Sequence, residues 1–258
     1  MVKSFMKKLY SFLVYLFLYA PILVLIIFSF NNSKSRVRWS GFTLKWYVGL
    51  FNDTQILKAL YYTILIALLA ALISTILGTF AAIGIHNSSI HMKKLLLNLN
   101  YLPVLNPDIV TAVGLMLLFN LMRIEKGFLT MLLAHISFCT PYVVLAIMPK
   151  LKQLPKNILE AALDLGATPL YALRKVILPE IKEGIISGAL IAFTLSIDDF
   201  VISFFNTGSG VSNLSINIYS MARKGINPKI NALSTLMFLT VLILLLVINK
   251  KSLKGEKN

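Results

Sequence analysis

Long apolar stretches separated by short polar segments are the feature that most constrains this chain. A helix needs about 20 mostly apolar residues to cross the roughly 30 Å hydrocarbon core of a bilayer. Six stretches of the chain reach this length. The prediction of a span is weakest for the third stretch, because Pro103 and Pro107 interrupt its start. The intervening segments are too short for a soluble domain, so the sequence predicts an all-α, polytopic membrane protein with one transmembrane domain over residues 1–258. The six predicted spans are 9–30, 59–85, 102–122, 128–149, 184–205 and 231–249.

Composition argues against a soluble protein. Hydrophobic residues make up 57% of the chain and charged residues 14%, whereas a typical soluble domain carries about 25% charged residues. The formal net charge is +15, but basic residues in so apolar a chain more often flank membrane spans than bind nucleic acid. These values exclude a disordered chain and a soluble nucleic-acid binder. The single cysteine, Cys139, excludes an internal disulfide, and its apolar surroundings predict a buried core residue.

The distribution of Lys and Arg indicates the orientation. All 25 of these residues lie outside the predicted spans. If the N-terminus is cytoplasmic, 15 of them lie on the inner side and 10 on the outer side, which favours both termini being cytoplasmic. The outer loop 31–58 weakens this bias because it includes Lys34 and Arg36. The first apolar stretch is too long for a signal peptide and lacks a cleavage pattern, so we expect a retained anchor.

Three acidic residues lie inside the predicted spans: Asp108, Asp198 and Asp199. Each ionisable group costs about 2.5–3.5 kcal/mol to place in hydrocarbon, and no span contains a Lys or Arg to offset the charge. A pathway for cations explains such a set. Asp108 has a second explanation, because Asn106-Pro107-Asp108 is typical of a helix start, where the helix dipole stabilises an acid.

Asp198 and Asp199 also have a purely structural alternative. Asp198 lies roughly 21 Å along the fifth span from its inner end, which places the pair in the outer half of the bilayer. In a continuous helix the two side chains point about 100° apart, so one can face a pathway while the other faces a neighbouring helix. Either can instead cap a helix or form hydrogen bonds inside the bundle. The sequence does not decide which acid faces the pathway.

The remaining polar residues in the spans have structural interpretations. His135, beside Ser137 and Thr140, is expected to be a neutral group that forms hydrogen bonds between helices. The segment 74–79 (STILGT) is typical of close helix packing, and Asn206 is expected to be a solvated cap near an outer span end. The sequence contains no Walker phosphate loop, metal-ligand motif or nucleophile motif. We therefore predict no catalytic residues, no metal, no cofactor and no enzymatic activity.

The inner loop 150–183 reads as two short helices. Pro155 suits the first turn of one helix, and apolar residues follow at helical spacing. Gly166 suits a left-handed helix end, and Thr168-Pro169 suits the start of a second helix, with threonine as the N-cap. The second helix is predicted to stop before Pro179. Such an elbow can lie on the membrane surface or provide a docking surface for another protein.

The motif in this loop resembles the EAA loop of ABC importer permeases. Glu160-Ala161-Ala162, Gly166 and Leu178-Pro179 occupy the family's positions, and Val176 stands where isoleucine is usual. The resemblance implies a type I ABC importer permease fold, with six transmembrane helices and 150–183 as a cytoplasmic coupling loop that docks on an ATPase subunit. It implies the following coupling residues: Glu160, Ala161, Ala162, Asp164, Gly166, Leu178 and Pro179.

Four further runs resemble spermidine/putrescine permeases: 41–47 (GFTLKWY), 135–141 (HISFCTP), 193–200 (FTLSIDDF) and 218–223 (IYSMAR). The resemblance implies a subunit of a bacterial plasma (inner) membrane importer that moves polyamines into the cytoplasm. The implied partners are a homologous permease that completes a heterodimer, two ATP-binding subunits and an extracytoplasmic solute-binding protein. Because cations also bind aromatic faces, Phe200, Phe204 and Tyr219 join the three acids as candidate pathway residues.

Other functions remain open at this stage. An ABC permease for another small solute, such as an amino acid, an anion, iron or another cation, would carry the same loop, although acids without basic partners argue against an anion. An intramembrane aspartyl protease could use Asp108 and Asp198, but its Gly-x-Gly-Asp pattern is absent. A self-powered cation transporter would leave the coupling loop unexplained. The sequence does not distinguish spermidine from putrescine.

Overall fold

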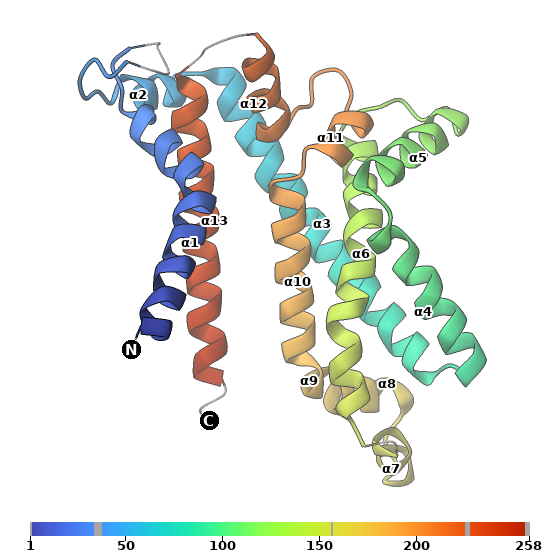
Figure 1. Ribbon diagram of the computed structural model, residues 1–258. Helices are drawn as coiled ribbons and strands as arrows, with labels where there is room; N and C mark the ends of the chain where they lie inside the picture. Colours follow the sequence, from blue (N-terminus) through green and yellow to red (C-terminus); the bar gives the residue numbers. More distant parts are fainter. Residues whose placement is uncertain (1, 34–37, 156, 225–227, 256–258) are drawn as a thin grey trace. The chain divides into compact units, whose positions relative to one another are not determined.

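The computed structural model describes residues 2–33, 38–155, 157–224 and 228–255, with the side chains of 6–33, 38–155, 157–224 and 228–243 (Figure 1). Lys34 and Arg36 lie outside the described residues. Within these ranges the regular elements are helices, and an isolated bridge joins Asn31 to Phe42. This confirms the all-α prediction. The chain divides into two compact units, Met1–Lys58 with Asn217–Asn258 and Ala59–Ile216, and each is described by itself.

The first unit pairs the two ends of the chain. Helix α1 (Val2–Ser29) packs along α13 (Lys229–Gly255), and the short α2 (Lys45–Phe51) also packs against α13 (Figure 1). The segment after α1 folds back on its end, because the indole Nε1 of Trp46 donates to the carbonyl of Asn31 at 2.8 Å. Large apolar side chains of α1 are exposed in this chain, as a surface that faces lipid or another subunit requires.

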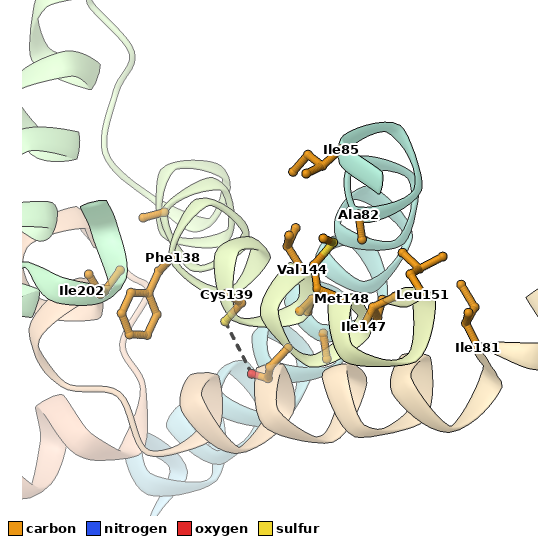
Figure 2. Close-up of a cluster of buried hydrophobic side chains, with 14 of the residues drawn as sticks. Ala82, Ile85, Phe138, Cys139, Val144, Ile147, Met148, Leu151, Ile181 and Ile202 are labelled. Atoms are coloured by element: carbon orange, nitrogen blue, oxygen red, sulfur yellow. Dashed lines mark hydrogen bonds between the residues drawn. The ribbon is translucent and has the colours of Figure 1, made fainter. Parts of the chain in front are cut away.

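The second unit is built around α6 (Phe128–Gln153). Helix α10 (Lys182–Ile197) packs along it, part of α3 (Thr54–Asn87) also contacts it, and Figure 2 shows the buried cluster that joins them. Two glycines permit this close contact. A Cβ on Gly78 of α3 would lie 2.6 Å from Cγ1 of Val143, and a Cβ on Gly188 of α10 would lie 3.0 Å from the same atom. Gly78 therefore has the packing role that the sequence predicts.

Within the described parts of the chain, three helices are long and apolar enough to cross a membrane: Met6–Ser29, Thr54–Asn87 and Phe128–Gln153. They contain most of the first, second and fourth predicted spans. The sixth predicted span, 231–249, is helical throughout as part of α13. Six crossings and a single domain over residues 1–258 both remain predictions.

The third predicted span, 102–122, is not one helix. Its first residues end α4 (Ile90–Leu105), the rest forms α5 (Asp108–Leu121), and the two helices meet at 103°. Asn106 is extended, with φ −75° and ψ 146°, because a residue before proline is disfavoured in the helical region. Residues 90–101, predicted as part of a loop, are helical.

The fifth predicted span, 184–205, is also broken. Helix α10 ends at Ile197 and α11 (Val201–Asn206) begins after three residues outside a helix. The prediction of a continuous helix through Asp198 and Asp199 is therefore wrong. Both acids lie in this interruption, which we call the fifth-helix break (residues 198–200).

Candidate functional site

The Asp199 carboxylate explains why the helix restarts where it does. Its Oδ1 accepts from the backbone N–H of Ile202 at 3.1 Å, and its Oδ2 accepts from the N–H of Ser203 at 2.7 Å. The first N–H groups of a helix have no partner within the helix, and an acid just ahead of them satisfies them. A short acidic side chain of this kind competes with helical continuation. Asp199 therefore caps α11, one of the structural alternatives left open by the sequence.

The carbonyl groups of the fifth-helix break find partners at the start of α12 (Leu214–Arg223). Asn213 Nδ2 donates to the Asp199 carbonyl at 2.9 Å, and Ser215 Oγ donates to the Asp198 carbonyl at 3.1 Å. The Asn213 Oδ1 accepts from the N–H of Ile216 at 2.9 Å, so this residue also caps α12. Backbone groups that lose their helical partners must be satisfied in hydrocarbon, and these two side chains meet that requirement.

His135 of α6 lies across the same break. Its Nδ1 is 2.6 Å from Ser196 Oγ, and its Nε2 is 2.9 Å from Ser203 Oγ and 3.5 Å from Asp199 Oδ2. The histidine is fully buried. The prediction of a hydrogen-bonding group between helices is thus confirmed, with partners in both α10 and α11.

Asp198 and Asp199 differ in exposure. The side chain of Asp199 is 7% exposed and its oxygens accept hydrogen bonds, whereas Asp198 is exposed in this chain. Phe200 and Phe204 accompany them, with ring centroids 5.3 Å apart and an interplanar angle of 36°. The break thus contains an exposed acid two residues before Phe200, whose ring packs with that of Phe204, and carboxylates and aromatic faces both attract organic cations.

The other two candidate pathway residues lie elsewhere. Asp108 is exposed in the first turn of α5, the position that its helix-start interpretation predicts. The same helix is tied to α11, because Asn206 Nδ2 donates to the Ala112 carbonyl at 3.2 Å. Tyr219 belongs to the first unit, and its ring lies 5.9 Å from the Arg223 guanidinium carbon. The aromatic face of Tyr219 therefore already carries a cation.

Two further buried residues test the sequence interpretation. Cys139 is fully buried and its thiol donates to the Ala192 carbonyl at 3.5 Å (Figure 2), which confirms the core prediction. Asn206 is also fully buried, so the prediction of a solvated cap is wrong. Its carbonyl accepts from Thr130 Oγ1 at 2.8 Å. Asn206 is buried because it joins α11 to the start of α6 as well as to α5.

The second candidate site is the elbow between α6 and α10, which we define as residues 158–180. Helix α7 (Ile158–Asp164) ends in a Schellman motif: the N–H of Gly166 donates to the Leu163 carbonyl, and that of Ala167 to the Ala162 carbonyl. Gly166 has φ +84°, as its position in the sequence predicts. Thr168 Oγ1 accepts from the Tyr171 N–H at 3.3 Å at the start of α8 (Pro169–Ala172), which confirms the predicted N-cap.

The predicted end of the second elbow helix is wrong. The chain continues from α8 through one π-helical turn (Leu173–Ile177) into α9 (Leu178–Glu180), so Pro179 lies inside helical structure. In the π turn the N–H of Leu178 donates to the Leu173 carbonyl. Pro179 then occupies the first turn of α9, directly after the π turn.

The elbow presents an apolar surface. Leu165 is 89% exposed and Leu170 is 74% exposed, and a shallow groove lies between α7 and the π turn. The groove is lined by Ala162, Leu165, Gly166, Ala167, Thr168, Tyr171 and Val176. Of the implied coupling residues, Ala162 and Leu178 are half-buried, and the exposed ones are Glu160, Ala161, Asp164, Gly166 and Pro179.

An ion pair joins the two helices that flank the elbow, α6 and α10. Lys150, near the end of α6, donates to the carboxylate of Glu183 at the start of α10. The hydrogen bond from Lys150 holds the pKa of Glu183 below its usual value. Because the pair is solvent-exposed, we assign it a small contribution to the stability of the elbow.

Among the residues that the structure describes, no group of three His, Cys, Asp or Glu side chains could hold a metal ion.

Comparisons with known proteins identify the class. Residues 74–250 match the family described as binding-protein-dependent transport system inner membrane component, so the chain belongs to that family. It is an inner-membrane, multi-pass transport component, as the family and the apolar helices together indicate.

Individual relatives narrow the comparison. The chain is 38% identical over 258 residues to the spermidine/putrescine transport system permease protein PotC of Haemophilus influenzae, covering 100% of both chains. It is 42% identical over 232 residues to the putrescine transport system permease protein PotI of Escherichia coli, covering 86% of this chain and 81% of that one. A crystal structure of a bacterial ABC transporter involved in the import of the acidic polysaccharide alginate shares the fold, with TM-score 0.77 at 12% identity and 96% coverage of each chain.

Proposed function

We propose that this chain is a permease subunit of an ABC importer that moves spermidine or putrescine into the cytoplasm. The observation that carries the proposal is the exposed Asp198 at the fifth-helix break, two residues before Phe200, whose ring packs with that of Phe204. A polyamine that leaves water must exchange its hydration for carboxylates and aromatic faces. The names of the relatives as spermidine/putrescine and putrescine permeases support the same substrate class.

Within this proposal the two acids have different roles. Asp198 contacts the substrate cation, whereas Asp199 caps α11 and holds the break together. Asp108 contributes mainly to the start of α5, where it lies in the first turn. Asparagine should therefore serve almost as well as aspartate at this position. Phe200 and Phe204 supply aromatic faces beside Asp198. Tyr219, whose ring already faces the Arg223 guanidinium, stays a predicted pathway residue.

The remaining parts of the importer are proposed from the family. ATP hydrolysis takes place on two separate ATP-binding subunits, which bind the elbow on the cytoplasmic side through its exposed apolar residues Leu165 and Leu170. A homologous permease completes the heterodimer, and an extracytoplasmic solute-binding protein delivers the substrate. The chain crosses the membrane six times with both termini in the cytoplasm. In this arrangement α4 and α5, which meet at 103°, together form the third crossing.

The test is uptake of radiolabelled spermidine and putrescine into vesicles that hold the assembled transporter at matched amounts. Asp198→Asn keeps the shape but removes the charge, and we expect it to lower uptake at least tenfold with assembly intact. Asp108→Asn should change uptake less than threefold. Asp199→Asn should instead reduce the stability of the complex, because an amide has only one oxygen to accept the bonds that the carboxylate accepts.

Two results would contradict the proposal. If Asp198→Asn transports both polyamines like the parent, this acid is not part of the cation pathway. If neither polyamine is taken up by the parent while an amino acid or iron is, the chain serves a different solute.

A further inference from the structure

The His135 side chain joins the two halves of the broken fifth helix. Ser196 lies in the last turn of α10 and Ser203 in the first turn of α11, and the two ring nitrogens of His135 bond one serine each. One rigid ring, held on the central helix α6, therefore sets the separation of the two helix ends. The residues that it connects are 61 and 68 positions away in the sequence.

The directions of the hydrogen bonds follow from counting protons. The Ser203 hydroxyl donates its one proton to Asp199 Oδ2 at 2.8 Å, and its oxygen accepts from Asn213 Nδ2 at 2.8 Å. His135 Nε2 must then donate to Ser203, since that hydroxyl has no second proton to give. A neutral imidazole with its proton on Nε2 accepts at Nδ1, so Ser196 donates there. Each member of the network has a partner with neutral histidine and ionised Asp199.

The network acts at a distance from the exposed acid. His135 is fully buried, so it does not contact a solute in this conformation. Its effect reaches Asp198 through the backbone, because the break has only three residues and both ends are fixed: Ser196 on one side, and Ser203 with Asp199 on the other. Asn213 and Ser215 hold the two carbonyls between them.

We propose that His135 is a positioning residue for transport: it clamps α10 to α11 and thereby fixes the place at which the fifth-helix break presents Asp198 to the substrate. The proposal rests on the proposed function, in which Asp198 contacts the polyamine. It adds a residue that touches no substrate and yet sets the apparent affinity. Losing the clamp should leave the helices intact and make the break mobile.

The experiment uses His135→Leu, which removes both hydrogen bonds at similar volume, in the complete transporter reconstituted in lipid. Two quantities are measured: hydrogen exchange of the amides in 198–206, and the concentration dependence of spermidine uptake. We expect exchange in that segment to become at least tenfold faster, since Asp199, which accepts from the Ile202 and Ser203 amides, loses the histidine that holds it and Ser203 in place. The apparent KM should rise at least tenfold, while the maximal rate per assembled complex changes less than threefold.

Matched variants separate positioning from general damage. Thr140→Val removes a hydroxyl of the same helix that donates to Ile136 one turn earlier, and it should leave both quantities unchanged. His135→Gln can bond in two directions and should restore most of the affinity. If His135→Leu fails to assemble, Ser196→Ala removes only the α10 side of the clamp, and it should raise the KM by a smaller factor.

The outcomes separate this proposal from the proposed function. Unchanged exchange in 198–206 would overturn the clamp, whatever the uptake result. Faster exchange with an unchanged KM would overturn the positioning role. If Asp198→Asn transports like the parent, the pathway assignment fails, but hydrogen exchange still tests whether His135 holds the break.

Discussion

Replacing Gly166 by alanine or valine should disable the elbow and leave the helix bundle intact. Gly166 has φ +84°, and a Cβ at this position would meet no atom within 4 Å. The cost is therefore conformational and not steric, about 1–2 kcal/mol for alanine in a left-handed conformation and more for the β-branched valine. Both Schellman hydrogen bonds depend on this conformation. Helix α7 has only seven residues, and a helix of that length is marginal without its end contacts.

A matched control comes from another glycine. Gly84 of α3 also has open space where a Cβ would lie, but its φ is outside the left-handed range. Gly84→Ala should therefore be neutral or stabilising by roughly 0.5–1 kcal/mol. The assays are retention of the ATP-binding subunits after solubilisation and spermidine uptake, both at matched amounts of permease. We expect Gly166→Val to lower both at least fivefold, and Gly84→Ala to lower neither.

The reasoning fails if Gly166→Val retains the ATP-binding subunits and transports like the parent. It also fails if the variant lowers the melting temperature of the whole complex as much as a core substitution does, because the elbow would then support the bundle. If uptake is lost while the ATP-binding subunits are retained, the elbow still binds these subunits but no longer transmits their movement to the helix bundle.

Two further predictions concern packing and topology. Gly188→Leu places a side chain against Val143, whose Cγ1 lies 3.0 Å from the Cβ position, and overpacking of this kind costs about 1–3 kcal/mol. Thermal unfolding of the purified complex should show a lower midpoint that Val143→Ala partly restores, and no restoration would contradict the assigned contact. Reporter fusions after Asn258 and within the segment 206–224 should report opposite sides of the membrane. If both report the same side, the six-crossing arrangement is wrong.

The elbow is largely predictable because its structure is set by neighbours in the sequence. A glycine with positive φ at the end of α7 and a threonine N-cap before Pro169 are local features, and both are present. The π turn is not predictable in this way. Pro179 normally ends a helix, and only the shift of the Leu178 hydrogen bond to Leu173 lets helical structure continue.

The fifth-helix break depends on local and non-local contacts together. The run 193–200 reads as part of a continuous span, and the sequence leaves open whether Asp199 caps a helix; the partners of the Asp198 and Asp199 carbonyls become evident only when α12 is in place. Asn213, directly ahead of α12, is a further local signal for a cap in this region. His135 meets Ser196 and Ser203 across more than 60 residues, a separation at which sequence spacing carries no information. The two acids can be recognised in the sequence from their cost in hydrocarbon, but their division into one exposed and one buried carboxylate requires the fold, because His135 approaches Asp199 from a distant part of the chain.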